Sequence, residues 1–106
     1  MAHFIVLATD RPGCLRLREQ VRPEHRRFLR DPGEHRVRVL LAGPTLEETG
    51  QTMNGTLLVA EAQSLEEVTR FVADDPYAKA GLFEQVVIRP WNCGICRFEA
   101  TTPGGA

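Results

Sequence analysis

Two ionisable residues, His25 and Asp75, occupy positions from which proton chemistry is possible. His25 falls on the apolar stripe of a predicted helix, which also carries Val21 and Phe28. Asp75 closes a second predicted helix, within Asp74-Asp75-Pro76-Tyr77. Histidine changes charge near neutral pH, and a carboxylate can orient its imidazole ring. If both face one cleft, the pair predicts general acid–base catalysis.

Each of these residues also has a structural interpretation. A single histidine on a helical stripe is more often a hydrogen-bonded core residue than a catalytic one. Asp75 directly precedes Pro76 and is well placed to cap a short helical turn. Pro23 is expected to break or kink the first helix, which puts His25 in the first turn of a new segment, where free amides favour the neutral imidazole. Capping and catalysis are compatible, so both roles stay open.

The cysteines indicate neither a metal site nor a redox site. Cys93-Gly94-Ile95-Cys96 follows the last predicted strand, without the helix of a redox dithiol or the second ligand pair of a zinc site. With Cys14 the count is odd, which does not make a disulfide framework and fits a reducing, cytoplasmic compartment. His3 and His35 have no spaced partner and are expected to be solvated. We therefore expect no metal and no cofactor, and the role of the CxxC pair stays open.

The elements that must position these residues follow from the apolar pattern. Strands are predicted at residues 4–8, 36–42, 56–60 and 83–90. One helix is predicted over residues 14–29, and a second begins at Ser64, which forms a capping box with Glu67. Gly43-Pro44 is expected to end the second strand and Asn54-Gly55 to turn into the third. The order βαββαβ predicts a ferredoxin-like α+β fold, with both helices on one face of a four-stranded antiparallel sheet.

The predicted strands are apolar on both of their faces, for example over residues 4–8 and 57–60. A strand with one covered face alternates apolar and polar residues, so the second face of this sheet also needs a cover. Two helices cannot cover both faces. We therefore expect a homodimer, in which the sheets of two copies pack face to face or close into a barrel.

Length and charge exclude several classes of protein. A chain of 106 residues has room for one core, so a second domain is not expected. The net charge of −1 lacks the basic excess of a nucleic-acid-binding surface. No apolar run reaches the roughly 18 to 20 residues of a membrane span. Arginines crowd the first third of the chain, either as a solvated face or as a lining that attracts an anionic small molecule.

Several short segments share their order and spacing with one family of small proteins. These are Phe4-Ile5-Val6-Leu7-Ala8, Arg22-Pro23-Glu24-His25, Leu41-Ala42-Gly43-Pro44, Gly55-Thr56-Leu57-Leu58, Asp74-Asp75-Pro76-Tyr77 and Ile88-Arg89-Pro90-Trp91. Together they resemble the YCII-related (YciI-like) family. The resemblance covers roughly residues 3–92, so we expect a domain over residues 1–92 and a tail over residues 93–106. It implies the dimeric α+β barrel fold, which agrees with the expected homodimer.

The resemblance also implies a site and a class of reaction. The histidine–aspartate pair proposed for the family falls on His25, as general base, and Asp75, as its orienter or the proton donor. Gly43, Pro44 and Tyr77 are expected to line the pocket. The implied activity is that of a cofactor-independent isomerase or lyase on a small cyclic or aromatic molecule, since a chlorinated-aromatic dehydrochlorinase belongs to the family. The alternative is a non-catalytic module that binds a small molecule in the same pocket.

Overall fold

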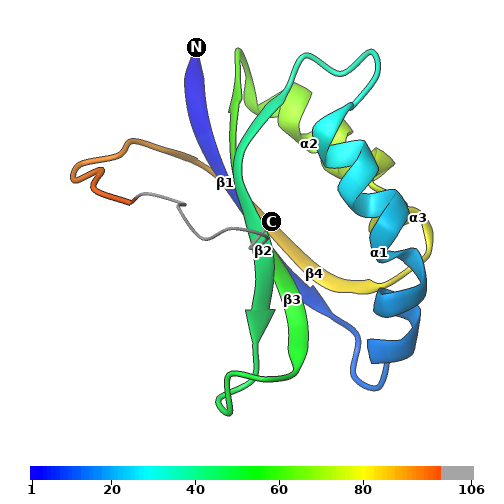
Figure 1. Cartoon of the computed structure of the whole chain (residues 1–106). Helices are drawn as coiled ribbons and strands as arrows, with labels where there is room; N and C mark the ends of the chain where they lie inside the picture. The colour runs from blue at the N-terminus through cyan, green and yellow to red at the C-terminus, as the bar shows by residue number, and fades with distance from the viewer. Residues whose placement is uncertain (99–106) are drawn as a thin grey trace.

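One antiparallel sheet carries the helices on a single face (Figure 1). The structure is a computed structural model that describes residues 1–98. Its strands are β1 (Ala2–Asp10), β2 (Arg38–Leu46), β3 (Met53–Ala62) and β4 (Phe83–Trp91). Its helices are α1 (Leu15–Arg30), α2 (Leu65–Asp74) and α3 (Pro76–Lys79). The strand order β2-β3-β1-β4, with antiparallel neighbours throughout, confirms the predicted ferredoxin-like α+β class.

The hydrophobic core lies between the sheet and the helices. Phe4 and Val6 of β1 point to the helix side, paired across the strands with Ala60 and Leu58 of β3. Phe71 of α2 is fully buried against this layer. Because successive strand residues point to opposite faces, the alternation in β1 assigns the intervening residues to the other face of the sheet.

The start of α2 is held by the residues that the capping pattern predicted. The hydroxyl of Ser64 accepts the backbone N–H of Glu67 at 3.2 Å. The Glu67 carboxylate in turn accepts the backbone N–H of Gln63 at 3.3 Å, one residue before the N-cap. Two free amides at the helix entrance are thereby satisfied.

Helix α1 runs unbroken through Pro23, so the predicted break is wrong. A proline inside a helix leaves the carbonyl four residues earlier without its amide partner. Here that carbonyl belongs to Glu19, and both Glu19 and Pro23 are exposed, so water can satisfy it. His25 therefore lies in the middle of a continuous helix, and the expected effect of free amides at a helix start does not apply to it.

The hairpin between β2 and β3 is longer than predicted. β2 continues through Gly43 and Pro44 to Leu46, so these two residues do not end it. The proline is tolerated because β2 is an edge strand, where a missing N–H need not interrupt a ladder.

The turn of this hairpin lies at residues 47–52, where Gly50 adopts a φ of 75°. Asn54-Gly55 lies inside β3 instead, so the predicted turn there is wrong. Gly55 is required for a different reason: a Cβ at this position would collide with the backbone carbonyl of Ala8 and the hydroxyl of Thr45. Glycine thus permits close approach of the strands rather than a turn.

The sheet face opposite the helices is apolar, and no helix among residues 1–98 covers it, although Val59 within it is only 9% exposed. Leu7 of β1 is paired with Leu57 of β3 on one side and Val87 of β4 on the other. Leu7, Leu41 and Leu57 are 44%, 40% and 45% exposed. We call this surface, made of Ile5, Leu7, Leu41, Leu57, Val59 and Val87, the open face.

Beyond β4 the structure describes residues 92–98 of the predicted tail, and residues 99–106 lie outside the described residues. Cys93 and Cys96, whose role the sequence left open, form a disulfide with each other. Cys14 is free. Within residues 1–98, no helix has both the length and the apolar character needed to cross a bilayer.

Candidate active site

The structure brings His25 and Asp75 into direct contact, although they are 50 residues apart in the sequence. His25 comes from the middle of α1, and Asp75 from the junction between α2 and α3. The imidazole Nδ1 lies 2.8 Å from each carboxylate oxygen of Asp75. The residues are 5% and 2% exposed, so the pair is shielded from bulk water.

The position of Asp75 is fixed by its role as a helix cap. Its Oδ1 accepts the backbone N–H of Tyr77 at 2.9 Å, and Pro76 occupies the first position of α3. Proline there costs no hydrogen bond and sets the backbone angle for the helix. The carboxylate therefore caps α3, as expected, and it also contacts the imidazole.

The geometry determines which imidazole nitrogen is available for chemistry. A carboxylate accepts hydrogen bonds and donates none, so the proton of a neutral His25 ring resides on Nδ1 and the lone pair on Nε2. Among residues 1–98, Nε2 makes no hydrogen bond, and it is also not one of the fully buried atoms without a partner. Nε2 is therefore the ring nitrogen whose lone pair is available to accept a proton.

Tyr77 lies beside the pair, with its ring held between two side chains of α1. The His25 ring stacks on it with 3.9 Å between centroids and 18° between planes. The guanidinium carbon of Arg18 lies 4.5 Å from the centre of the same ring. Two planar groups at these distances cannot share one face of the ring, so they cover opposite faces. Arg18 and His25 are seven residues apart on α1, which is about two helical turns and leaves room for the phenol between them.

The hydroxyl of Tyr77 is buried, and in the described part of the chain it has no hydrogen-bond partner. Burial raises the pKa of this phenol above its ordinary value of 10.0; Asp75 and Asp10 also raise it, whereas the positive charges of Arg18 and Arg22 oppose the shift. The phenol therefore stays protonated at neutral pH and can donate a hydrogen bond.

This shift predicts a loss of stability in alkali. Because the pKa is raised in the folded state, the free energy of unfolding is expected to fall as the pH rises above 10.0, where the unfolded phenol ionises first. Tyr77 is the single tyrosine of the chain, so tyrosinate absorbance reports it alone. Denaturant unfolding from about pH 9 to about pH 11 measures the loss, and Tyr77→Phe should lack this contribution. Ionisation in the folded state below 10.0 would contradict the assignment.

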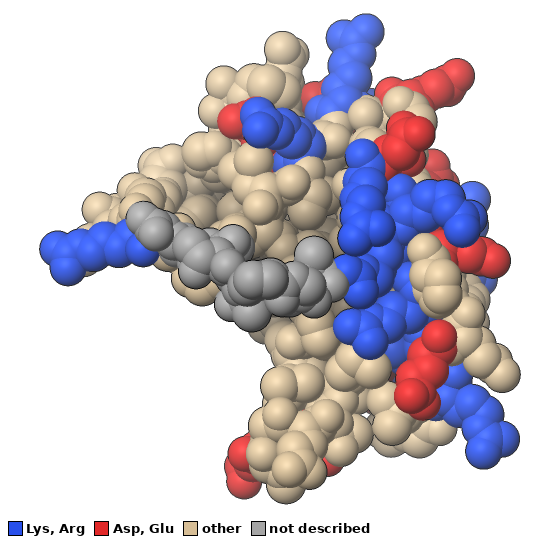
Figure 2. Space-filling view, in the orientation of Figure 1, with Lys and Arg blue, Asp and Glu red and all other residues tan. Residues whose placement is uncertain are grey.

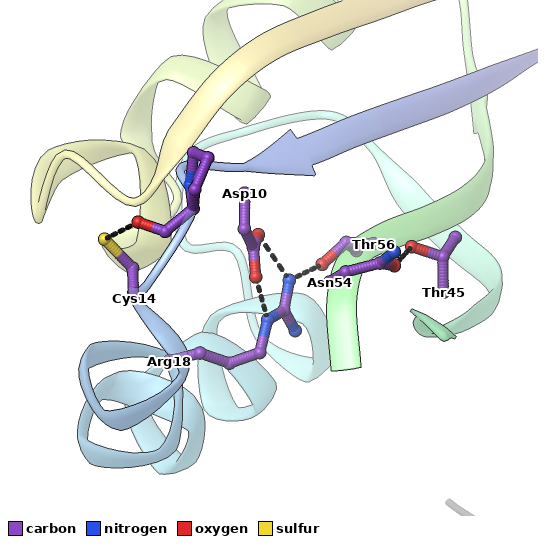
Figure 3. Close-up of polar contacts among 7 residues, drawn as sticks. Asp10, Cys14, Arg18, Thr45, Asn54 and Thr56 are labelled. Atoms are coloured by element: carbon purple, nitrogen blue, oxygen red, sulfur yellow. Dashed lines mark hydrogen bonds and ion pairs between the residues drawn. The ribbon is translucent and has the colours of Figure 1, made fainter. Parts of the chain in front are cut away.

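A second polar cluster, which the sequence reasoning missed, lies at the end of β1 (Figure 3). The Nε and one terminal nitrogen of Arg18 donate to the carboxylate of Asp10 at 2.6 and 3.0 Å. The same terminal nitrogen donates to the hydroxyl of Thr56 at 2.7 Å. Arg18 is 2% exposed, so this ion pair is buried. Asp10 has the parity of the buried residues of β1, and Arg18 shares the helical stripe of His25, so both signals were present in the sequence.

The remaining predicted pocket residues are placed by β2. Pro44 is paired with Thr56 and lies on the helix side of the sheet, next to the Arg18 cluster. Gly43 is paired with Leu57 and lies on the open face. Two surface cavities of about 590 Å³ flank α1, and neither is lined by Gly43, Pro44, Tyr77 or the His25–Asp75 pair.

One of these cavities contains another histidine–carboxylate pair. His35 Nε2 lies 2.7 Å from Asp74 Oδ2, with side chains 21% and 51% exposed. His35 therefore pairs with Asp74, and His3 lies 3.5 Å from Glu61, although the sequence spacing indicated neither contact. Within residues 1–98, no three His, Cys, Asp or Glu side chains are grouped so as to hold a metal ion.

The fold is that of the dimeric α+β barrel proteins, in which a ferredoxin-like sheet carries its helices on one face. Residues 2–92 match the sequence model of the YCII-related domain. The chain therefore belongs to the YCII-related family, as the resemblance predicted. It is 31% identical over 97 residues to protein YciI of Escherichia coli O6:H1, covering 84% of this chain and 95% of that protein. An uncharacterized protein of Haemophilus influenzae is 25% identical over 94 residues, covering 85% of this chain and 96% of that protein.

Solved structures agree with this assignment. The 5-chloro-2-hydroxyhydroquinone dehydrochlorinase TftG of Burkholderia phenoliruptrix, in complex with 2,5-dihydroxybenzoquinone, is similar with a TM-score of 0.74 and 34% identity. That alignment covers 87% of this chain and 95% of TftG. An antibiotic biosynthesis monooxygenase shares the fold with a TM-score of 0.53 and 10% identity, over 88% of this chain and 98% of that one.

Proposed function

We propose that the protein is a cofactor-independent lyase or isomerase that moves protons on a small hydroxylated ring, with His25 as the general base. The observation that carries this proposal is the buried contact of His25 Nδ1 with both oxygens of Asp75. It leaves Nε2 as the proton acceptor and provides a carboxylate that stabilises the imidazolium formed. The similarity to TftG supports the dehydrochlorinase type of reaction.

In such an elimination, the substrate ring reacts as its keto tautomer, in which one hydroxyl proton has moved to the carbon that bears chlorine, and Nε2 takes the proton of another hydroxyl group. The electron pair left behind forms a new double bond in the ring system, and chloride leaves with the electrons of the carbon–chlorine bond. The substrate thus loses H⁺ to His25 and Cl⁻ to solvent, so no oxidant or reductant is needed. Asp75 does not take the proton; it offsets the positive charge of the ring while His25 carries it.

The charge around the site favours an anionic or readily ionised substrate. Figure 2 shows Lys and Arg side chains gathered on the side of the molecule where α1 runs. The arginines of α1 are Arg16, Arg18, Arg22, Arg26, Arg27 and Arg30. Arg22 is close enough to lower the pKa of Tyr77 through its charge. These arginines were interpreted either as a solvated face or as a lining that attracts an anionic small molecule. The charge of Arg22 near Tyr77 supports the second interpretation.

We also propose that the protein is a homodimer joined through the open face. Leucines that are 40–45% exposed on three adjacent strands form a continuous apolar surface. In a dimer with two-fold symmetry, the same surface of each copy contacts the other copy. The open face of a second chain can therefore bury the open face of the first.

Chloride release tests the activity. The protein is expected to accelerate chloride loss from 5-chloro-2-hydroxyhydroquinone over the rate in buffer, measured by ion chromatography. Chlorobenzene, which has no hydroxyl group to ionise, is the control and should release none. Calorimetry with 2,5-dihydroxybenzoquinone measures binding separately. Binding without chloride release would contradict the enzyme and support the non-catalytic binding module, whereas neither binding nor release would contradict both.

A further inference from the structure

The chain continues beyond the family domain in a short segment that begins on the open face. Residues 2–92 match the YCII-related domain, and β4 ends at Trp91. Trp91 is paired with His3 of β1, and His3 has the parity of Leu7, so the Trp91 side chain lies on the open face. We call residues 92–98 the arm. Figure 1 shows the arm (orange) leaving the sheet on the side away from α1 and α2.

The arm carries two apolar side chains that lie in solvent in the single chain. Ile95 and Phe98 are 81% and 75% exposed, more than any other large apolar side chain within residues 1–98. Exposed apolar groups that cluster on one surface are typical of a protein–protein contact. Trp91, at the base of the arm, is 38% exposed and adds an aromatic ring, a residue type enriched at the centre of such contacts. Together these side chains favour a partner on the side of the open face.

A second copy of this chain is the partner that the position of the arm favours. In the homodimer proposed above, the open face of one copy contacts that of the other, and stacked sheets lie about 10 Å apart. The chain from Trp91 to Ile95 can span up to about 13 Å. The arm is therefore long enough to cross this spacing and contact the second copy, and two-fold symmetry forms the same contact twice.

The disulfide between Cys93 and Cys96 restricts the conformation of the arm. It closes a loop of four residues, with Gly94 and Ile95 at its tip. A segment that is already held in one loop loses less conformational freedom on docking than an open chain does. The disulfide therefore strengthens a contact made by Ile95, even where its own sulfur atoms contribute no contact area.

We propose that the arm docks on a second copy of the chain and that the redox state of the Cys93–Cys96 disulfide sets the strength of this contact. The inference rests on the homodimer proposed above, because it assigns a further contact to that dimer. Cys96 is exposed and Cys93 is half-buried, so a small thiol can reach the bond. One thiol forms a mixed disulfide with one cysteine and releases the other, and a second thiol displaces the mixed disulfide. Two small thiols thus supply two electrons and two protons, and the products are two cysteine thiols and one small-molecule disulfide.

The dissociation constant of the dimer, measured by sedimentation over a range of concentrations, tests the docking of the arm. Ile95→Asp should raise this constant about tenfold to a hundredfold, as expected for a lost apolar anchor of an interface. The variant should fold normally, because Ile95 lies outside the helices and strands and is exposed in the single chain. Leu15→Asp is the matched control. It places the same charge at an exposed position on the helix side, the first residue of α1, and should change the constant less than about threefold.

Reduction with a small thiol tests the role of the disulfide. The dissociation constant of the wild type should rise by between about threefold and about twentyfold, the upper value being the closure entropy of a four-residue loop expressed as a ratio of constants. The double variant Cys93→Ser/Cys96→Ser should match the reduced wild type and should not respond to the thiol. Because it retains Cys14, this variant also shows whether the thiol acts elsewhere in the chain.

Trp91 gives an independent readout, because it is the single tryptophan of the chain. At a concentration at which the wild type is dimeric, acrylamide should quench its fluorescence less in the wild type than in Ile95→Asp, and equal quenching would contradict the docking of the arm. A dissociation constant unchanged by Ile95→Asp would overturn the docking, and one unchanged by reduction would overturn the role of the disulfide, while in both cases the dimer itself would stand. A wild type of one chain mass at every concentration would overturn the dimer and the arm together.

Discussion

Replacing His25 by glutamine is expected to lower the rate of chloride release by about 10²–10⁴-fold, the usual contribution of a general base. Glutamine can preserve a hydrogen bond to Asp75, but its amide cannot accept a proton at neutral pH. Packing should change little, since the side chain keeps a similar length. The measurement is the rate constant for chloride release at saturating substrate, with circular dichroism to verify the fold.

The second histidine–carboxylate pair provides the matched control. His35→Gln removes an imidazole bonded to Asp74, the residue next to Asp75, yet this pair lies at the surface. Its rate of chloride release should stay within a few-fold of the wild-type rate. A loss in His35→Gln comparable to that in His25→Gln would contradict the assignment of the base to His25.

Asp75→Asn separates the two roles of the carboxylate. Asparagine caps helices about as well as aspartate, so α3 should be retained. The amide no longer offsets the imidazolium charge and can stabilise the wrong tautomer of His25, so the rate should fall by up to about 10⁴-fold. In this variant the free energy of unfolding should stay nearly the same while the rate of chloride release falls. If Asp75 acted only as a cap, the rate of chloride release would not change.

The contact between His25 and Asp75 was predictable because each lies on a strongly patterned element. The apolar stripe of α1 assigns His25 to the buried side, and the Asp-Pro step assigns Asp75 to the start of α3. In a βαββαβ order both helices occupy one face of the sheet, so the two positions can meet across 50 residues of sequence.

The predictions that failed concern proline and glycine, whose effect depends on what surrounds them. Pro23 does not break α1 because the carbonyl it deprives of a partner faces water, and Pro44 lies within β2 because that strand is at an edge. Gly55 serves close packing of strands rather than a turn. Solvent access, position at a sheet edge and the neighbouring atoms all depend on the tertiary structure. Local propensity therefore could not predict how these prolines and this glycine behave.

The Arg18 cluster was missed for a different reason. Its partners Asp10 and Thr56 come from β1 and β3, and charged residues at core positions usually argue against a core assignment. Only the register of β1 with β3 places Thr56 opposite Ala8 and beside the end of β1. A charged residue at a core position of an otherwise apolar series therefore indicates that it has a buried partner elsewhere in the fold.

Leu57→Asp is expected to convert the protein from a dimer into single chains. Leu57 is 45% exposed in one chain, so a charge there costs little in the monomer. In a dimer joined through the open face, each copy would bury an unpaired carboxylate, and the two-fold symmetry doubles the cost, to several kcal/mol in total. Sedimentation at micromolar concentration should give twice the 11.9 kDa chain mass for the wild type and one chain mass for the variant.

Leu65→Asp is the matched control for this experiment. Leu65 is 43% exposed, nearly the same as Leu57, but it opens α2 on the helix side of the sheet. An aspartate in the first turn of a helix is favourable, so this variant should remain a folded dimer. Two results would contradict the proposed interface: a wild-type protein of one chain mass, or a Leu57→Asp variant that stays dimeric. Leu57 lies on the sheet face opposite His25 and Asp75, so the variant also tests whether one chain contains the whole site. Single chains that still release chloride would show that it does. Single chains that no longer release chloride would show that the second copy completes the site.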